Sequence, residues 1–363
     1  EWKETYGTII LDQFKKMGVS MDWSRTRFTM DEKYQKAVVS AFLHYHKNGL
    51  LYRAEKVINW CTRCQTSLSD LEIEYKEERT KLYYIKYPLV QNQEEENERR
   101  EHVVVATTRP ETMLGDSAGA VHPSDARYKN LIGKRVILPI QNREIPIIAD
   151  MEIDENFGTG AVKVTPAHDL LDARIGEKNN LPIHKVIGPL GKMTEEAGEL
   201  CVGLKIAECR RVIIEDLTRQ HLIEKTDEYA HNVAVCYRCG GVIEPLPSLQ
   251  WFLKMETLAK KAIEAVEKSE TKFYPKHWEK AYFDWLKNIR DWNISRQIWW
   301  GHRLPVFYCG KKLEMHDTQN AERGTQNFVV ADKKPASCPF CNECDMAQET
   351  DVLDTWFSSA LWP

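Results

Sequence analysis

The feature that most constrains the fold is a pair of Cys-x-x-Cys motifs separated by a long stretch of chain. They are Cys61-Thr-Arg-Cys64 and Cys236-Tyr-Arg-Cys239, with roughly 170 residues between them. A two-residue spacer lets one knuckle supply two thiolates, and a tetrahedral zinc ion takes four. If both motifs bind one ion, the intervening chain leaves and returns at the same point and forms an inserted domain. The alternative is two unrelated cysteine pairs.

A second group of cysteines lies toward the C-terminus. Cys338, Cys341 and Cys344 have the short spacing of metal ligands, and Cys309 lies upstream of them. Cys309 has no second cysteine shortly after it, so these four residues form either a second zinc site or a degraded one. The sequence therefore predicts one zinc ion at the first site and leaves a second ion open.

Composition indicates a globular protein of a reducing compartment. The 363 residues are 42% hydrophobic and 29% charged with a net charge of −4, which argues against binding nucleic acid by bulk positive charge. No apolar run approaches the ~20 residues of a membrane span, and the first residues lack a signal-peptide pattern, so we expect no membrane contact and a cytoplasmic location. Thiolate ligands are then more common than disulfides, and Cys201 and Cys209 are expected to be ordinary apolar residues.

Hydrophobic periodicity predicts strands flanked by helices. Helices are expected over residues 30–49, 206–220 and 253–268. Alternating segments separated by turn signals predict strands over residues 81–88, 103–107, 133–139, 143–149 and 161–165, with a solvated hairpin tip over 91–101. Short strands at this spacing are typical of a compact barrel. The expected fold class is α/β, as an α+β fragment with a strand-rich barrel and peripheral helices, and the tryptophans of the 273–305 segment are expected in cores or domain joints.

Two strand ends carry the polar residues from which a site could be built. Residues 103–116 read Val-Val-Val-Ala-Thr-Thr-Arg-Pro-Glu-Thr-Met-Leu-Gly-Asp, and residues 161–172 read Ala-Val-Lys-Val-Thr-Pro-Ala-His-Asp-Leu-Leu-Asp. In each, a β-branched run stops at a proline and gives way to polar groups, so we interpret the two as one site. Period-two alternation places Lys163 and Thr165 on one face of their strand, opposite Val162 and Val164.

A helix is expected to begin directly after the second strand. Thr165 and Pro166 have the character of an N-cap and a first helical residue, which would put Asp169 and Asp172 on one face near the positive end of the helix dipole. Both carboxylates should then stay ionised. Two such carboxylates suit an aminoacyl ester, because one can hold its ammonium and the other a side-chain hydroxyl. His168 is expected to be structural, and no Ser-His-Asp or Cys-His nucleophile is evident.

Several segments together resemble the class I aminoacyl-tRNA synthetases for branched aliphatic amino acids. They are residues 106–116, 163–169, 250–252, 288–303 and 351–363. Within that group, Asp354-Thr-Trp-Phe-Ser-Ser-Ala-Leu-Trp-Pro363 is similar to the valine-specific enzymes rather than to the isoleucyl or leucyl enzymes. The His-Ile-Gly-His and Lys-Met-Ser-Lys-Ser signatures of ATP handling and an anticodon-binding domain are absent. We therefore expect a fragment that contains the connective insertion with its editing domain.

The resemblance implies a domain organisation around parts of a Rossmann-type core. A zinc-pinned neck would carry the editing barrel, and the Trp-rich part would return to the core. The expected units are a helical flank of the core (1–60), zinc-linked neck strands (61–76 and 232–250), the editing domain (77–231), a Trp-rich helical return (251–308), a second zinc knuckle (309–350) and the start of the returning core (351–363).

The resemblance also implies an activity, the hydrolysis of Thr-tRNA(Val). The full-length enzyme would attach valine to tRNA(Val) using ATP and Mg²⁺, and a monomer is expected. Valine and threonine are nearly isosteric, so a synthetic pocket rejects threonine poorly, whereas a pocket that bonds the hydroxyl can exclude valine. An aminoacyl ester is already activated, so positioning a water against its carbonyl group is sufficient chemistry.

Side-chain roles follow from the same resemblance. Asp169 would hold the amino group and Asp172 would bond the threonine hydroxyl, while Lys163 or backbone amides take the developing oxyanion. We expect the rest of the pocket to consist of Arg109, Phe157 and Thr165. The terminal adenosine and the water would be contacted by Thr107, Thr108 and Thr112, and a further contact to the substrate would come from Glu111. Asp354 and Trp356 would line the amino-acid side of the synthetic pocket. The residues after Asp169 depart from the Pro-Asn-Asp-Tyr-Glu of the family, with Leu170, Leu171, Ala173 and Arg174 at the flanking positions.

Two other interpretations remain open at this point. One is a metal-braced tRNA-docking module without hydrolytic activity, which would bind through Trp- and Arg-rich surfaces. The other is an editing fragment of the related isoleucyl enzyme. Activation of valine by this chain itself is not expected, because no motif in it can bind the phosphates of ATP.

Overall fold

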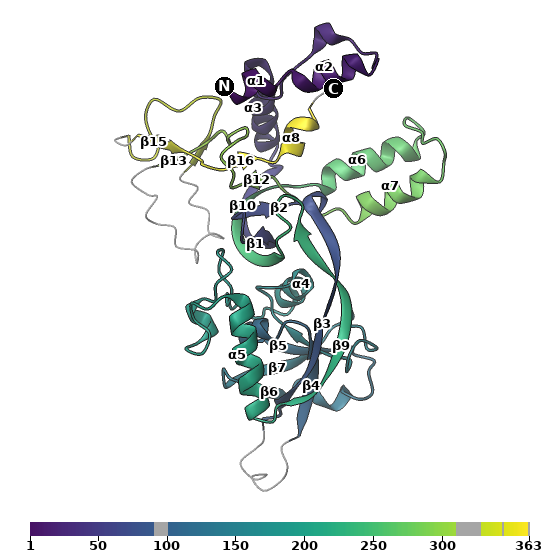
Figure 1. Ribbon diagram of the computed structural model, residues 1–363, viewed down its shortest axis with the longest axis vertical. Coiled ribbons are helices and arrows are strands. Elements are labelled where there is room, and N and C mark those ends of the chain that lie inside the picture. The colour runs from purple at the N-terminus through teal and green to yellow at the C-terminus, as the bar shows by residue number, and fades with distance from the viewer. Residues whose placement is uncertain (91–100, 310–327, 343–344, 362–363) are drawn as a thin grey trace.

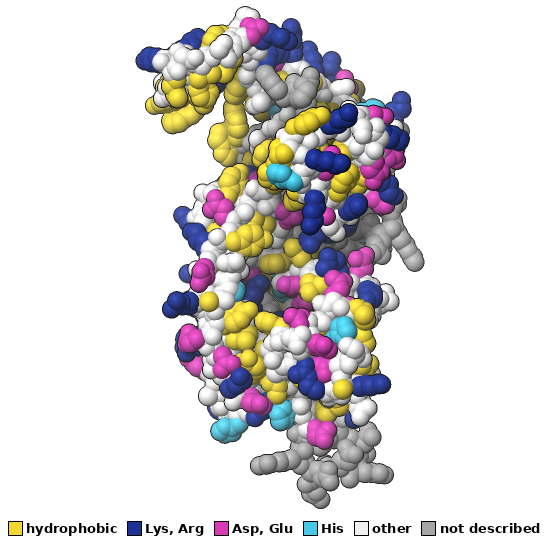
Figure 2. Space-filling view, turned by 90° about the vertical axis from the view of Figure 1, so that its right-hand side faces the viewer, with side chains coloured by type: hydrophobic (Ala, Val, Ile, Leu, Met, Phe, Trp, Pro, Cys, Tyr) yellow, Lys and Arg dark blue, Asp and Glu magenta, His cyan; other side chains and the backbone are white. Residues whose placement is uncertain are grey.

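The computed structural model describes residues 1–90, 101–309, 328–342 and 345–361. The molecule is elongated in two perpendicular views (Figure 1, Figure 2) and is mixed α/β, with several small sheets arranged along its long axis. Helices α1 (Trp2–Tyr6), α2 (Ile9–Lys16), α3 (Glu32–Lys47) and α8 (Thr355–Ser359) lie at the upper end, together with the N-terminus. The lower end is a separate strand-rich body that holds α4 (Leu170–Lys178) and α5 (Ile206–Arg219).

A four-stranded antiparallel sheet forms the middle of the molecule, in the order β11-β10-β1-β2. Its strands are β1 (Leu51–Cys61), β2 (Thr66–Leu68), β10 (Ile243–Leu253) and β11 (Trp292–Asn293). β1 and β10 pair along their whole lengths, from Leu51 opposite Leu253 to Cys61 opposite Ile243. Segments that precede and follow the inserted chain therefore lie side by side, as the cysteine spacing predicts.

A long antiparallel ribbon of β3 (Ile73–Pro88) and β9 (Ile223–Cys236) leads from the middle sheet to the lower body (Figure 1). β4 (His102–Thr107) pairs with the other edge of β3. A second sheet of the body has the order β6-β7-β5-β8 and consists of β5 (Ala118–Val121), β6 (Arg135–Leu138), β7 (Arg143–Ala149) and β8 (Ala161–Val164). Its β5–β7 pair is parallel and its other pairs are antiparallel.

The main hydrophobic core of the body is formed by these two sheets and α5. Ile85 and Val105 come from the ribbon sheet, Ile145 from the second sheet and Leu217 from α5, and all are buried. An isolated bridge joins Leu89, directly after β3, to Val136 of β6. Among the described residues the two sheets do not form one continuous hydrogen-bonded ring, so the predicted compact, strand-rich barrel is not established.

The upper end has a second core and two small strand groups. Val38 and Phe42 of α3 pack with Trp251 and Phe357 in this core. The strands are β12 (Ser295–Arg296) with β16 (Val352–Leu353), and β13 (Val306–Cys309) between β14 (Phe328–Val330) and β15 (Met346–Gln348). Helices α6 (Glu256–Glu267) and α7 (Trp278–Lys287) form a hairpin that projects from one side (Figure 1).

Most predicted elements are confirmed where the structure describes them. The three predicted helices are α3, α5 and α6, and Asp31 caps α3 by accepting a hydrogen bond from the Tyr34 amide at 2.8 Å. The predicted hairpin tip lies almost entirely outside the described residues. The expectation that the tryptophans are internal is wrong for several of them, since Trp278, Trp285, Trp299 and Trp300 are exposed. None of the described helices is long and apolar enough to cross a bilayer.

Candidate active site and metal centres

The two polar strand ends predicted from the sequence lie next to each other. β4 ends at Thr107 and is followed by a short 3-10 helix, η4 (Pro110–Gly115), which leads to Asp116. The next strand, β5, pairs with β8 so that Ala118 lies opposite Val164. This pairing brings Asp116 beside Thr165, the first residue after β8, so the two segments are in contact, as the interpretation of them as one site requires.

Lys163 is the centre of this cluster. Its side chain is buried, and its Nζ lies 2.6 Å from Thr165 Oγ1, 2.8 Å from Thr112 Oγ1 and 3.5 Å from Asp116 Oδ1. The Thr165 hydroxyl lies 2.6 Å from the same Asp116 oxygen, and the Thr112 hydroxyl donates to the carbonyl oxygen of Arg109 at 3.0 Å. Lys163 and Thr165 thus share one face of their strand, as alternation predicts.

Asp172 borders the cluster from α4. Its Oδ2 accepts a hydrogen bond from the Thr165 amide at 2.8 Å, and its side chain is buried. Burial raises the pKa of Asp172 to about 7, and the opposing effect of Lys163 offsets this only in part. The expectation that both acids stay fully ionised is therefore wrong for Asp172, which carries a proton in part of the molecules at neutral pH.

Asp169 has a different position from the one predicted. It is the N-cap of α4, and its Oδ1 accepts hydrogen bonds from the amides of Leu171 at 2.7 Å and Asp172 at 3.0 Å. The predicted cap, Thr165, is not available because its hydroxyl is bonded to Asp116 and Lys163. The helix therefore begins later than the sequence predicts, although Asp169 remains exposed at its start.

Arg109 is held by two carboxylates. Its Nε lies 3.3 Å from Glu111, and its Nη2 bonds to Glu244 of β10. Glu111 is fully buried and also receives both Nε and Nη2 of Arg210, at 2.7 and 2.9 Å. Burial alone would lower the pKa of Arg109, but Glu244 and Glu111 raise it overall. Glu111, predicted to contact the substrate, is thus occupied by two arginines and anchors Arg109.

His168 and Thr107 have structural partners. His168 Nε2 accepts hydrogen bonds from the amides of Val186 at 3.0 Å and Ile187 at 3.2 Å, and its Nδ1 lies 3.2 Å from the Pro245 carbonyl oxygen. Burial lowers the pKa of His168 to about 3, so the ring is neutral, as expected of a structural histidine. Thr107 Oγ1 accepts the Arg109 amide at 3.0 Å.

Three further predicted residues have contacts outside the Lys163 cluster. Phe157 is partly exposed and meets the ring of Tyr229, on β9, edge to face. Asp354 caps α8 at the upper end of the molecule, where Trp356 is about half exposed. Trp356 lines a cleft of about 1240 Å³ between the outer face of α4, the edge of β1 and the segment after α7. Lys163 and Asp172 are not among the residues that line this cleft.

The first metal centre has the predicted geometry. The sulfur atoms of Cys61, Cys64, Cys236 and Cys239 lie within 4.8 Å of one another, and the Cys61 and Cys239 sulfurs are 3.5 Å apart. A tetrahedron with Zn–S bonds of about 2.3 Å has edges of about 3.8 Å, so these thiols fit zinc. The amides of Cys64 and Gly241 donate to two of the sulfurs.

The second metal centre is described in part. The Sγ atoms of Cys309, Cys338 and Cys341 lie within 4.8 Å of one another, with 3.7 Å between Cys309 and Cys341. Cys344, the fourth predicted ligand, lies outside the described residues. The three thiols can hold a metal ion, and the two sites consist of cysteine alone, which is typical of structural zinc.

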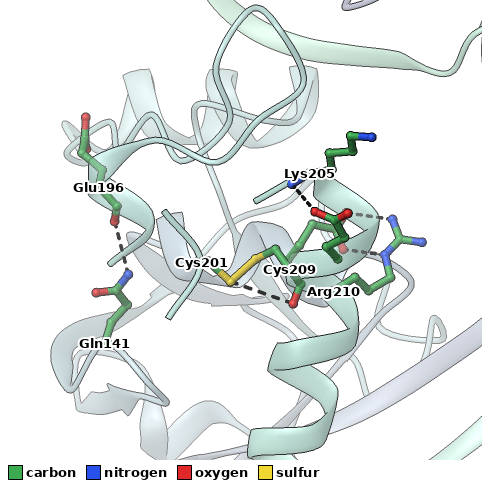
Figure 3. Close-up of a disulfide and its surroundings, with 8 residues drawn as sticks. Gln141, Glu196, Cys201, Lys205, Cys209 and Arg210 are labelled. Atoms are coloured by element: carbon green, nitrogen blue, oxygen red, sulfur yellow. Dashed lines mark hydrogen bonds and ion pairs between the residues drawn. A yellow bond between two sulfur atoms is a disulfide. The ribbon is translucent and has the colours of Figure 1, made fainter. Parts of the chain in front are cut away.

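Cys201 and Cys209 correct one prediction. Both are fully buried, but they form a disulfide instead of packing as free apolar side chains (Figure 3). A turn hydrogen bond from the Leu204 amide to the Cys201 carbonyl folds the loop back onto α5, which brings the two Cα atoms within 5.2 Å. The next residue on α5 is Arg210, which bonds to Glu111.

Four residues of the site were not predicted from the sequence. Asp116 and Tyr87 contribute to the Lys163 cluster, and Arg210 and Glu244 hold Arg109. A single acid next to an apolar strand was the only sequence signal for Asp116. Arg210 and Glu244 offered no signal, because they lie 99 residues from Glu111 and 135 residues from Arg109 respectively.

Comparison with known proteins gives the family. The model of the class I tRNA synthetases (I, L, M and V) matches residues 1–363. The chain is 48% identical over 363 residues to a valine–tRNA ligase of Thermotoga maritima and covers 40% of it. It is also 50% identical to the valine–tRNA ligase of Petrotoga mobilis and 47% identical to that of Geobacter sulfurreducens, over 363 residues and 39% of each.

The chain therefore spans about two fifths of the length of the curated relatives it matches. A crystal structure of the ternary complex of Agrobacterium radiobacter K84 agnB2 LeuRS-tRNA-LeuAMS aligns with 97% of this chain and 46% of that one, at 15% identity and a TM-score of 0.33, which is too low to establish a common fold. On its sequence, this chain belongs to the class I tRNA synthetase family of the I, L, M and V enzymes, within which it matches a segment of valine–tRNA ligases.

Proposed function

We propose that this chain is the part of a valine–tRNA ligase that removes threonine from mischarged tRNA(Val). The observation that carries the proposal is the convergence of Lys163, Thr112, Thr165 and Asp172 at two adjoining strand ends. The names of the relatives support the ligase, and the full-length protein would charge tRNA(Val) with valine using ATP and Mg²⁺. Two structural zinc ions would be held by the cysteine clusters.

The reaction is the hydrolysis of the aminoacyl ester. A water oxygen adds to the carbonyl carbon, the carbonyl oxygen takes the electron pair, and the Lys163 ammonium stabilises the charge that develops there. The bond between the carbonyl carbon and the ribose oxygen then breaks, and a proton from the water passes to the ribose oxygen. The products are threonine and a tRNA with a free terminal hydroxyl group.

Selection of threonine would depend on the two acids of α4. Asp169 is exposed and can receive the ammonium group of the amino acid, while Asp172 is buried and can bond a hydroxyl. With a pKa of about 7, Asp172 can accept a hydrogen bond when ionised and donate one when protonated. A valine side chain offers no partner to this buried group, so its binding leaves the group unsatisfied.

A docking module without hydrolytic activity is the second candidate. The exposed aromatic side chains favour it, because Trp299 is 90% exposed and Tyr274 is 86% exposed. Such rings can stack on unpaired bases. On this alternative the chain would bind tRNA but release no amino acid.

The deciding experiment is deacylation by the chain itself. Thr-tRNA(Val) and Val-tRNA(Val) are incubated with wild type, with Asp172→Ala and with Glu228→Ala, an exposed acid of the same body, and tRNA binding is measured in parallel. We expect threonine release by the wild type and the Glu228 variant, and a fall of about 100-fold or more in Asp172→Ala. Binding of tRNA without release of threonine would refute the hydrolytic function and support the docking module.

A further inference from the structure

Asp116 is a fully buried acid that takes no direct part in the proposed hydrolysis. We propose that Asp116 is the positioning residue of the site, which keeps Lys163 in its charged form and sets the direction of its hydrogen bonds, so that one ammonium N–H is left for the substrate carbonyl. The inference rests on the proposed function. It concerns a residue that touches Lys163 and Thr165 rather than the reacting ester.

The three side chains that contact the Asp116 carboxylate are all hydrogen-bond donors. Its Oδ2 accepts from the Tyr87 hydroxyl at 2.7 Å, and its Oδ1 accepts from Thr165 at 2.6 Å and faces Lys163 at 3.5 Å. Burial raises the pKa of Asp116, whereas Lys163, Thr165 and Tyr87 oppose this rise because a carboxylate can accept from all three donors. The ionisable groups that face the Asp116–Lys163 pair from neighbouring elements are Tyr87 of β3, Arg143 of β7, His168 before α4 and Asp172 of α4.

The direction of the hydrogen bonds follows from these partners. Thr165 has one hydroxyl hydrogen and gives it to Asp116, so toward Lys163 it can only accept. Thr112 gives its hydrogen to the Arg109 carbonyl oxygen and is likewise an acceptor for Lys163. Two of the three Lys163 N–H groups are therefore bound by short contacts of 2.6 and 2.8 Å.

The third contact of Lys163 is the one that a substrate can replace. At 3.5 Å the Asp116 oxygen is at the outer limit of a hydrogen bond, so a carbonyl oxygen can take that N–H at little cost. Asp116 still lies close enough to act as the counter-ion, since opposite charges at this distance favour each other's charged forms strongly in a buried site. A neutral residue at position 116 would remove both effects.

The test measures the charge of Lys163 directly. Wild type, Asp116→Asn and Asp150→Asn are labelled with trace acetic anhydride over a pH series from about 6 to 11, where the neutral amine is the reactive form. Acetylation of the peptide containing Lys163 is quantified by mass spectrometry against exposed Lys134. We expect Asp116→Asn to move the labelling curve of Lys163 to lower pH and to raise labelling about tenfold at mid-curve.

The matched control is Asp150→Asn, which makes the same substitution at a buried acid whose partner is Lys178 rather than Lys163. Its Lys163 curve should coincide with that of the wild type. An unchanged curve in Asp116→Asn would overturn the inference. An increase in Lys163 labelling by the same factor at every pH would also overturn it, since such an increase reports only that the side chain has become more accessible.

A second readout connects the inference with hydrolysis. If Lys163 acts as a charged donor, threonine release in Asp116→Asn should decline at a lower pH than in the wild type, and an unchanged alkaline limb would contradict the inference. Absence of threonine release in the wild type would instead refute the proposed function. The labelling curves need no turnover, so the two failures are distinguishable.

Discussion

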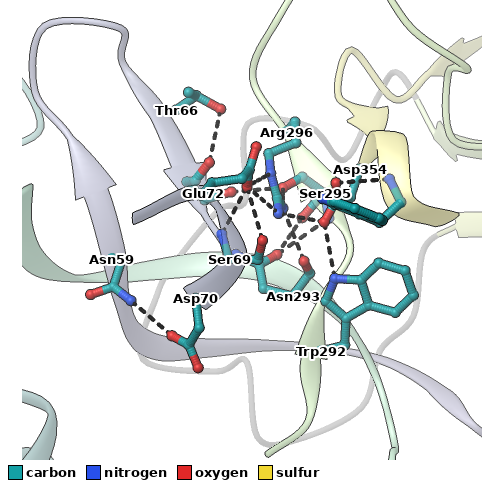
Figure 4. A network of polar contacts seen from close by, with 12 residues as sticks. Asn59, Thr66, Ser69, Asp70, Glu72, Trp292, Asn293, Ser295, Arg296 and Asp354 are labelled. Carbon is teal, nitrogen blue, oxygen red and sulfur yellow. Dashed lines mark hydrogen bonds and ion pairs between the residues drawn. The ribbon is translucent and has the colours of Figure 1, made fainter. Parts of the chain in front are cut away.

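The guanidinium of Arg296 bonds to a single carboxylate oxygen of Glu72, through Nε at 3.0 Å and Nη2 at 2.8 Å, although 224 residues separate the two. The same Nη2 lies 2.7 Å from Asp354, the cap of α8 (Figure 4). Arg238, between two knuckle cysteines, bonds to the other oxygen of Glu72 at 2.6 Å. A buried ionic network thus joins the first metal centre to the upper end of the molecule.

Replacing Arg296 with methionine should strongly destabilise this joint. The variant leaves the buried carboxylates of Glu72 and Asp354 without their shared cation, which typically costs about 3–5 kcal/mol. Urea unfolding should therefore show a much lower midpoint. Arg211→Met, which removes an exposed helical ion pair, should leave the midpoint unchanged, and an equal effect of the two variants would contradict the role of the network.

Each of the two cysteine clusters should bind one zinc ion. Metal analysis of the purified chain should give about two zinc ions per molecule, and about one for either Cys239→Ala or Cys341→Ala, because each removes a thiolate ligand from a different site. Cys201→Ala should retain the wild-type content, since Cys201 belongs to a disulfide. A full complement of zinc in Cys341→Ala would exclude the second site.

The stability of the chain should depend on the ionisation of Asp172. Its folded pKa of about 7 is above the ordinary aspartate pKa of 3.8, so its favourable contribution is fully present below about pH 4 and is lost as the pH rises through 7. Between about pH 5 and 8 the wild type should lose about 2–3 kcal/mol more than Asp172→Asn. The asparagine oxygen can still accept the Thr165 amide.

Unfolding by urea at several pH values measures this difference. Glu228→Gln, at an exposed position, should follow the wild-type dependence on pH. Parallel curves for wild type and Asp172→Asn would mean that Asp172 is ionised throughout, as the sequence predicts.

His168 should be needed for stability but not for proton transfer. His168→Ala leaves the amides of Val186 and Ile187 without their acceptor, at a cost of about 1–3 kcal/mol. Because the ring stays neutral down to a pKa of about 3, the pH profile of threonine release should keep its shape in the folded variant. His277→Ala, at an exposed position, serves as the control for stability, and loss of a limb of the profile in His168→Ala would reveal a general base.

The local features of this chain could be predicted from its sequence. Periodicity located α3, α5 and α6, alternation placed Lys163 and Thr165 on one face, and the two spaced cysteine pairs predicted that β1 and β10 would meet at one neck. The first two features depend on residues that are near each other in the chain. The third depends on two cysteine pairs that together supply the four ligands of one ion. The family, too, could be identified from contiguous motifs.

What depends on distant segments was decided by the tertiary structure. Thr165 does not cap α4 because its hydroxyl oxygen accepts from Lys163, while its hydrogen goes to Asp116, which the β5–β8 pairing brings alongside. Asp172 is not fully ionised because the surrounding chain buries it, and Cys201 meets Cys209 because a loop folds back onto α5. Burial and neighbouring charge set the pKa of a side chain and the partners of a hydroxyl group, and both arise only when remote parts of the chain pack together.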